Sequence, residues 1–105
     1  MRKAILIDCG QRNVQIIEID DQGTDIQTLK SYGIIDIEIP QQKTAMILDS
    51  KNPQHKWGFR FKEMILRNNT LIVAFDDKKR ITDITQQQYQ KIRRGVRWRR
   101  LGSRK

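Results

Sequence analysis

The chain has 105 residues, of which 37% are hydrophobic, and this is enough for one domain with a modest core. Its formal net charge of +9 is unevenly placed, with −3 in residues 1–50 (five Lys/Arg, eight Asp/Glu) and +12 in residues 51–105 (sixteen and four). The single cysteine, Cys9, excludes an intrachain disulfide and is typical of a reducing compartment. The apolar run in MRKAILID is too short for a signal peptide, and no run approaches the roughly 20 apolar residues of a membrane span. We therefore expect a soluble, cytoplasmic protein with no membrane partner.

The first two predicted elements form a β-hairpin. Lys3–Asp8 is a short apolar run bounded by charge, which predicts a buried strand, and Gly10 supplies a turn. Val14–Asp20 is the return strand. The apolar positions of this strand change parity at Ile16 and Ile17, which predicts a bulge or burial on both faces.

A short helix is predicted at about residues 25–32. Thr24 to Gln27 fits a capping box, and Gly33 lies where a C-terminal glycine is expected. Strands follow in the middle of the chain, and Leu71–Phe75 has the apolar run of a central strand. Their predicted ranges are Ile34–Ile39, Thr44–Leu48, Trp57–Phe61, Met64–Leu66 and Leu71–Phe75.

The last predicted element is a helix over residues 86–95. Its start is marked by a second capping box, Thr85 to Gln88, and Tyr89, Ile92 and Val96 form an apolar stripe for docking on a sheet. The element order predicts an α+β domain over residues 1–96, followed by a basic tail over 97–105. The sheet is expected to be mixed or antiparallel, with about five to six strands, a short helix after the second strand and the C-terminal helix packed on it.

The segment WGFRF has two interpretations. Gly58, Phe59 and Phe61 partly match the strand of an RNA recognition motif on which bases stack, but Trp57 and Arg60 depart from that pattern. Alternating aromatic residues more commonly mark the buried face of a strand, so we expect the three rings to lie in the core. An exposed stripe would instead be a stacking platform.

Basic residues gather at the end of the chain, where residues 91–105 contain eight Lys and Arg, one Trp and no acid. Arginine forks match phosphate geometry, and on a continued helix several of the charges share one side with Trp98 free to stack on a base. The alternative is a solvated tail with only nonspecific attraction. A second basic cluster precedes the same helix. The predicted nucleic-acid contacts are Lys78, Lys79, Arg80, Lys91, Arg93, Arg94, Arg97, Trp98, Arg99, Arg100, Arg104 and Lys105.

Candidates for catalysis are few. Cys9 is expected to be a buried structural residue, and His55, the only histidine, lies in a polar loop without a partner in sequence. Asp76 and Asp77 mark a turn more readily than a metal site, because adjacent acids on a strand point to opposite faces. The sequence has no zinc-ligand spacing, Gly-rich phosphate loop or Ser-His-Asp set. We expect no enzyme activity, cofactor or metal.

Several short phrases of the chain carry a family resemblance over about residues 1–98. They are the opening MRKAILID, the return VQIIEID, the late strand LIVAFDD, the step ITDIT and a closing helix that ends near VRW. This layout resembles a family of small uncharacterised proteins carried by phages and conjugative plasmids. The resemblance implies a mobile-element context, in which small genes encode binders of nucleic acid or of host proteins, and it carries over no site residue.

Two functional hypotheses remain open from the sequence. In the first, the protein binds the phosphate backbone of DNA or RNA through its C-terminal helix and tail, with strong salt dependence. In the second, it is an inhibitor or adaptor that binds a host protein without catalysis. There the basic face docks on an acidic surface, or the edge strand Ile34–Ile39 pairs with another chain.

Overall fold

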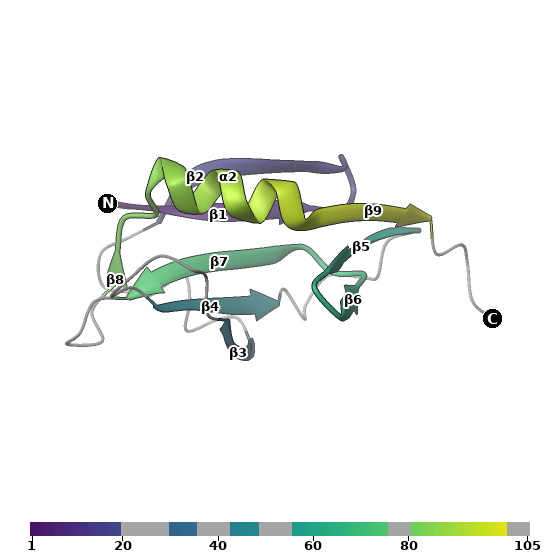
Figure 1. Cartoon of the computed structure of the whole chain (residues 1–105), viewed down its shortest axis with the longest axis horizontal. Coiled ribbons are helices and arrows are strands. Elements are labelled where there is room, and N and C mark those ends of the chain that lie inside the picture. Colours follow the sequence, from purple (N-terminus) through teal and green to yellow (C-terminus); the bar gives the residue numbers. More distant parts are fainter. Residues whose placement is uncertain (20–29, 36–42, 49–55, 76–80, 101–105) are drawn as a thin grey trace.

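A computed structural model of the chain describes residues 1–19, 30–35, 43–48, 56–75 and 81–100. These ranges form two antiparallel sheets and one helix near the C-terminal end, which confirms the α+β class (Figure 1). No helix within them is long and apolar enough to cross a membrane. The elements are β1 (Arg2–Asp8), β2 (Asn13–Ile19), β3 (Lys30–Ile35), β4 (Lys43–Leu48), β5 (Trp57–Phe61), β6 (Met64–Leu66), β7 (Thr70–Phe75), β8 (Ile81–Thr82), α2 (Gln86–Gly95) and β9 (Val96–Arg100).

The larger sheet has the strand order β2-β1-β7-β4-β3, with β8 paired to β7. All its ladders are antiparallel. The predicted hairpin is confirmed: β2 pairs with β1, and Arg12 in the turn has φ 55°. The predicted central position of β7 is also confirmed, and its residues Thr70 to Ala74 are buried.

The smaller sheet has three antiparallel strands in the order β6-β5-β9. Helix α2 continues directly into β9, and Figure 1 shows the two as one line of chain that runs in the direction of β1 and then reaches β5. Because β9 pairs with β5, the C-terminal part of the described chain is held against residues 57–61.

One apolar core joins both sheets and the helix, because buried side chains of β1, β4 and β7 meet those of α2, β5, β6 and β9. Its larger members are Ile5, Ile7, Met46, Ile72, Ile92, Phe59 and Phe61. A second cluster on the opposite face of the larger sheet contains Ala4, Ile19, Leu71 and Val73. The small sheet is therefore packed into the main core and is not a separate unit.

The C-terminal helix has the predicted bounds and the predicted cap. The Thr85 hydroxyl accepts a hydrogen bond from the backbone N–H of Gln88 (3.1 Å), and the Gln88 side-chain oxygen accepts one from the N–H of Thr85 (2.8 Å). The predicted apolar stripe is confirmed, since Ile92 and Val96 are buried. Tyr89 packs beside them and donates its hydroxyl to the Val14 carbonyl at 2.8 Å.

The structure differs from the sequence prediction in the sheet and in the first helix. One sheet of about five to six strands was predicted, and the described residues form two sheets with nine strands. Residues 20–29 lie outside the described ranges, but Lys30–Tyr32, placed in the predicted helix, belong to β3. The register of β3 shifts between Ser31 and Gly33, so this glycine lies at an irregularity of a strand and does not end a helix. Strand β3 is an edge strand in the described sheet, as predicted for Ile34–Ile39, although residues 36–39 are not described.

A second difference concerns the chain after Gly95. The segment predicted as a basic tail, for which a continued helix was considered, begins as a strand, because Val96–Arg100 pair with β5. Val96 and Trp98 are the apolar members of an alternation with Arg97 and Arg99, and this period of two fits a strand with one buried face. Residues 97–100 of the predicted tail are thus part of a sheet, and residues 101–105 lie outside the described ranges.

Candidate nucleic-acid interface

The pairing of β9 with β5 sorts their side chains onto two faces. Opposite residues of an antiparallel pair share a face, and successive residues alternate. Arg97 lies opposite Arg60, and Arg99 lies opposite Gly58. All three arginines are exposed. We call Arg60, Arg97 and Arg99 the arginine face of the small sheet.

Charge on the arginine face is not balanced by acids of the same sheet, since β5, β6 and β9 contain no Asp or Glu. Directly opposed side chains of an antiparallel pair have Cβ atoms roughly 4.5–5.5 Å apart, and like charges there destabilise the sheet. Arg97 and Arg99 lie two residues apart on one strand, a spacing of roughly 6.5–7 Å. An anion with several negative groups would relieve this repulsion.

Two of these guanidinium groups are held by backbone carbonyls. Arg60 donates from Nε to the Lys62 carbonyl at 3.0 Å, and Arg97 donates from Nη1 to the Arg94 carbonyl at 2.6 Å. Each guanidinium has five N–H donors, so one such bond orients the group and leaves others for an anion. Arg97 also satisfies a carbonyl at the C-terminal end of α2, where helices favour positive charge.

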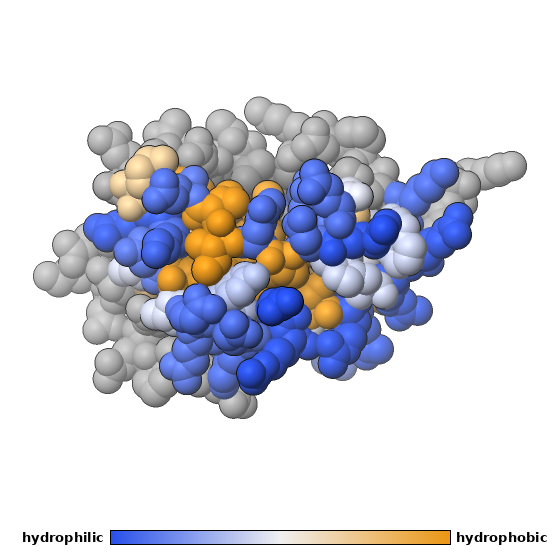
Figure 2. Space-filling view, turned by 90° about the horizontal axis from the view of Figure 1, so that it is seen from above, coloured by the Kyte–Doolittle hydropathy of each residue, from blue (hydrophilic) through white to orange (hydrophobic). Residues whose placement is uncertain are grey.

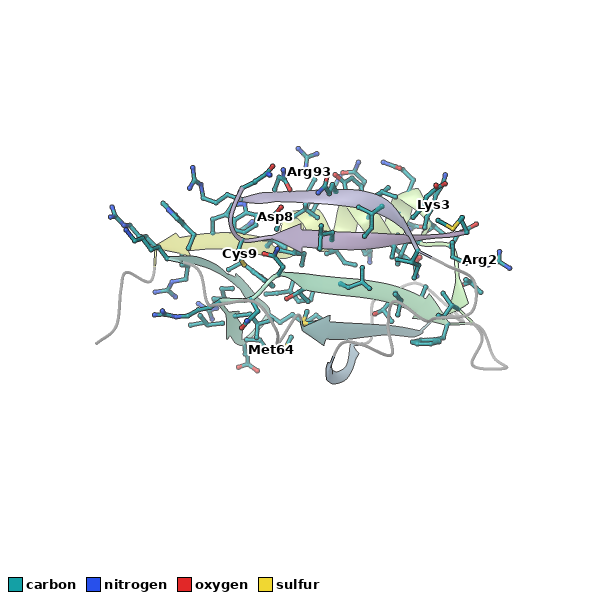
Figure 3. All side chains as sticks on the ribbon, turned by 180° about the vertical axis from the view of Figure 1, so that it is seen from behind. Arg2, Lys3, Asp8, Cys9, Met64 and Arg93 are labelled. Atoms are coloured by element: carbon teal, nitrogen blue, oxygen red, sulfur yellow. The ribbon has the colours of Figure 1, made fainter. Side chains whose placement is uncertain are left out.

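The end of α2 extends the basic surface. Arg93 and Arg94 lie in its last turn and are exposed, and Lys91 is half-buried. Figure 3 shows Arg93 pointing away from the body of the protein. Figure 2 shows hydrophilic side chains gathered at the end of the molecule where β9 lies. Arg100 is exposed as well, opposite Trp57 on the other face of the small sheet.

Apart from Arg100, the other face of the small sheet is apolar in β5 and β9. Phe59 and Phe61 are buried, which confirms the predicted core position for two of the three aromatic residues of WGFRF. Trp98 lies opposite Phe59, and the two rings meet edge to face with centroids 6.1 Å apart. Trp57 is half-buried, and the Arg12 guanidinium lies 4.7 Å from its ring centroid. Trp98 is therefore half-buried on the face opposite the arginines, and the exposed stacking position that we expected for it is not observed.

The structure brings together only part of the predicted set. Arg93, Arg94, Arg97 and Arg99 follow one another from the last turn of α2 into β9. Lys91 of α2 and Arg100 of β9 are also described. The other predicted cations and three candidate catalytic residues lie outside the described ranges: Lys78, Lys79, Arg80, Arg104, Lys105, His55, Asp76 and Asp77.

Sequence reasoning missed Arg60. The signal for it was present, because an alternating strand that buries Phe59 and Phe61 must point Arg60 outward. What the sequence does not show is that Arg97, far along the chain, lies directly opposite Arg60.

Cys9 has a structural environment. Its side chain is fully buried, its Sγ donates to the Asn68 carbonyl at 3.4 Å, and its backbone N–H donates to Asn69 Oδ1 at 2.9 Å. Burial, and then the charge of Asp8, raises the pKa of the Cys9 thiol to about 12. Figure 3 shows Cys9 next to Asp8 at the end of β1. The expected burial of Cys9 is confirmed. A thiol held neutral in the interior is a poor nucleophile.

Neither metal ligation nor similarity to known proteins adds to this site. Among the described residues, no three or more His, Cys, Asp or Glu side chains are grouped to hold a metal ion. The chain matches no protein-family model, no curated protein and no solved structure.

Proposed function

We propose that this protein binds nucleic acid through the phosphate backbone and has no catalytic activity. The binding surface consists of the arginine face (Arg60, Arg97, Arg99) and the exposed end of α2 (Arg93, Arg94). The resemblance to small proteins of phages and conjugative plasmids is part of the same proposal, since such a protein fits a mobile-element context.

One observation carries the proposal: Arg60 and Arg97 are directly opposed on an exposed face whose three strands contain no acid. A fold gains nothing from this arrangement by itself, because opposed like charges destabilise a sheet. A polyanion offers successive phosphates at a spacing comparable to that of Arg97 and Arg99. Backbone carbonyls orient the guanidinium groups of Arg60 and Arg97 before any ligand arrives.

The chemistry of this surface supports backbone contact more than base recognition. Its polar groups are guanidinium groups, and Trp98 packs on Phe59 on the opposite face of the sheet. Contacts to phosphates position a protein on nucleic acid but carry no sequence information. We therefore expect weak sequence preference and a steep dependence of affinity on salt.

The test is fluorescence-anisotropy titration of labelled single- and double-stranded DNA and RNA across a salt series. The test variant is the double substitution Arg97→Gln/Arg99→Gln, and the matched control is Arg2→Gln/Lys3→Gln, which removes the same charge from β1. Each lost phosphate contact lowers the slope of log K against log salt by about 0.7–0.9. We expect the test variant to lose about 1.4–1.8 of slope and the control to lose much less.

Two outcomes would end the proposal. One is the absence of binding by the wild-type chain near physiological salt, in which case the alternative of an acidic host-protein surface becomes the leading hypothesis. The other is an equal loss of slope in both double variants, which would mean that net charge alone, and not the arginine face, attracts the polyanion. Circular dichroism of each variant establishes that the fold is retained.

A further inference from the structure

Within the described residues, the edge of the larger sheet at β2 is only partly covered, by Tyr89 of α2, whose hydroxyl donates to the Val14 carbonyl. Among the described strands β2 pairs only with β1, and the ladder between them runs without a bulge from Asn13 to Ile19. The parity change at Ile16 and Ile17 therefore produces no bulge. Strand β2 has seven residues and contains no Lys, Arg or Pro. Natural edge strands are usually blunted by such residues or by bulges.

The edge strand β9 provides a contrast within the same molecule. It is an edge of the small sheet, and it carries Arg97, Arg99 and Arg100 on five residues. Charges of this density discourage pairing with another chain. Of these two edges, β9 carries the charged residues that usually discourage pairing, and β2 contains no Lys, Arg or Pro.

Apolar side chains accompany the free edge of β2. Val14 and Ile16 lie opposite Ile7 and Ile5, on the face of the sheet that carries α2. Val14 is half-buried, and Ile16 is 36% exposed, one of the exposed large hydrophobic residues of the described chain. Figure 2 looks onto this side of the molecule and shows an apolar strip between hydrophilic side chains. Covering this strip requires a partner that presents apolar groups next to a strand.

We propose that a second copy of this chain pairs with β2 in antiparallel fashion, so that the two larger sheets join across a twofold axis at Gln15. A twofold axis perpendicular to the sheet keeps the α2 faces of both copies on the same side. Directly opposed residues of an antiparallel pair point to the same face of the sheet, so both must have even numbers or both odd numbers in this strand. The twofold axis therefore passes beside one residue, which faces its own copy, and not between two residues. This leaves few registers to compare.

The charges of β2 and its turn select among these registers. With the axis at Gln15, Val14 lies opposite Ile16 of the second copy, and Arg12 lies toward Glu18 of the second copy. With the axis at Ile16, Val14 lies opposite Glu18 of the second copy. With the axis at Ile17, Ile16 lies opposite Glu18 of the second copy. Both alternatives place a carboxylate against an aliphatic side chain, which is unfavourable. Only the register at Gln15 joins the apolar residues and opposes charges of unlike sign.

A single shared strand pair gives a small interface, of the size seen in weak and transient complexes. We therefore expect a monomer–dimer equilibrium that depends on concentration. The pairing is independent of nucleic acid, because the arginine face lies on β5 and β9 and not on β2. The experiments are done after nuclease treatment and in high salt, so that a polyanion cannot bridge two copies.

The register is tested by cross-linking Gln15→Cys under mild oxidation, read on a non-reducing gel. In the proposed register the two substituted Cα atoms are about 4.5–5.5 Å apart, a separation that a disulfide spans. The matched controls are Asn13→Cys on the same strand and Ile65→Cys, an exposed position in β6. In the Asn13 variant the two cysteines are offset by four residues, about 13 Å. Native Cys9 is fully buried and does not compete.

We expect a covalent dimer from Gln15→Cys and little from either control. A Gln15→Cys variant that cross-links no faster than Asn13→Cys overturns the proposed register. The equilibrium is measured separately by sedimentation of the wild type, Ile16→Lys and the control Ile65→Lys, since both substitutions add one lysine at an exposed isoleucine. We expect the wild type and Ile65→Lys to dimerise with rising concentration and Ile16→Lys to stay monomeric. A wild type that stays monomeric throughout refutes the proposal.

Discussion

Gly95 at the end of α2 offers a sharp test of the packing between the helix and the small sheet. A Cβ atom added at this position would lie 2.8 Å from Cε1 and 3.1 Å from Cδ1 of the Phe61 ring. Phe61 is only 4% exposed and belongs to the core, so its ring has no solvent-filled space into which to withdraw. The structure therefore predicts that Gly95→Ala destabilises the protein.

The magnitude follows from two opposed effects. Alanine in a helix is favoured over glycine by up to about 1 kcal/mol, and this gain is smaller at the last residue. Overpacking a well-packed core costs about 1–3 kcal/mol. We expect a net loss of about 1–2 kcal/mol in the free energy of unfolding. For a domain of this size each kcal/mol corresponds to roughly 4–8 °C in Tm.

Urea denaturation followed by tryptophan fluorescence measures this loss, and a double-mutant cycle with Phe61→Leu assigns its cause. Removing the ring should make Gly95→Ala neutral or favourable in the Phe61→Leu background. A Gly95→Ala protein that is more stable than the wild type would refute the inferred close contact. So would a cost that is unchanged when the ring is absent.

Two further predictions concern the helix cap and the buried thiol. Thr85→Ala removes the hydroxyl that accepts a hydrogen bond from the Gln88 N–H, and it should lower the free energy of unfolding by about 1 kcal/mol. Thr85→Ser keeps a hydroxyl and should retain most of the wild-type stability. Equal denaturation midpoints for the two variants would exclude a stabilising cap. The folded pKa of Cys9, about 12, is above the unfolded value of 9.0, so its contribution to stability is complete below pH 9 and declines as the pH rises toward 12. The difference in unfolding free energy between wild type and Cys9→Ala should therefore narrow between pH 9 and pH 12. In a separate experiment, a thiol reagent at pH 8 should label Cys9 slowly until the chain is unfolded. Fast labelling of the native protein would contradict the burial of Cys9.

Local sequence patterns located most elements of the described chain. The hairpin strands, the apolar run of β7 and the helix at 86–95 were predictable because each depends on periodicity or on a cap within a few residues. The Thr85–Gln88 capping box is the clearest example, since both of its hydrogen bonds are formed. The burial of Phe59 and Phe61 followed from the alternation of WGFRF in the same way.

The pairing of the strands could not be predicted from local sequence patterns. The sequence indicated one sheet, and the structure has two, because β5 pairs with β6 and β9 and not with the larger sheet. The basic residues after Gly95 were predicted as helix or tail, since charge dominates that segment and only Val96 and Trp98 indicate a strand. The helix predicted up to residue 32 competed with the strand preference of Tyr32, Ile34 and Ile35, which prevails in β3.

For the candidate site, the sequence identified the arginines of β9 but not their arrangement. Arg60 became part of the site only through its register with Arg97. Trp98 was assigned to the surface because it stands among arginines, and the alternation that exposes Arg97 and Arg99 places its ring on Phe59.

The position of β1 between β2 and β7 has a consequence for how the protein is made. The β1–β2 hairpin can form as soon as residue 19 has been made, but the other edge of β1 stays unpaired until Leu71 and Ile72 pair with Leu6 and Ile5. The closing contacts come later still, when the Ile84 N–H reaches the Lys3 carbonyl. Chains dominated by such distant pairings fold in milliseconds to seconds. A nascent chain therefore carries an open, apolar hairpin until residues 70–84 have been added, and its yield in the cell should depend on chaperones that shield that hairpin.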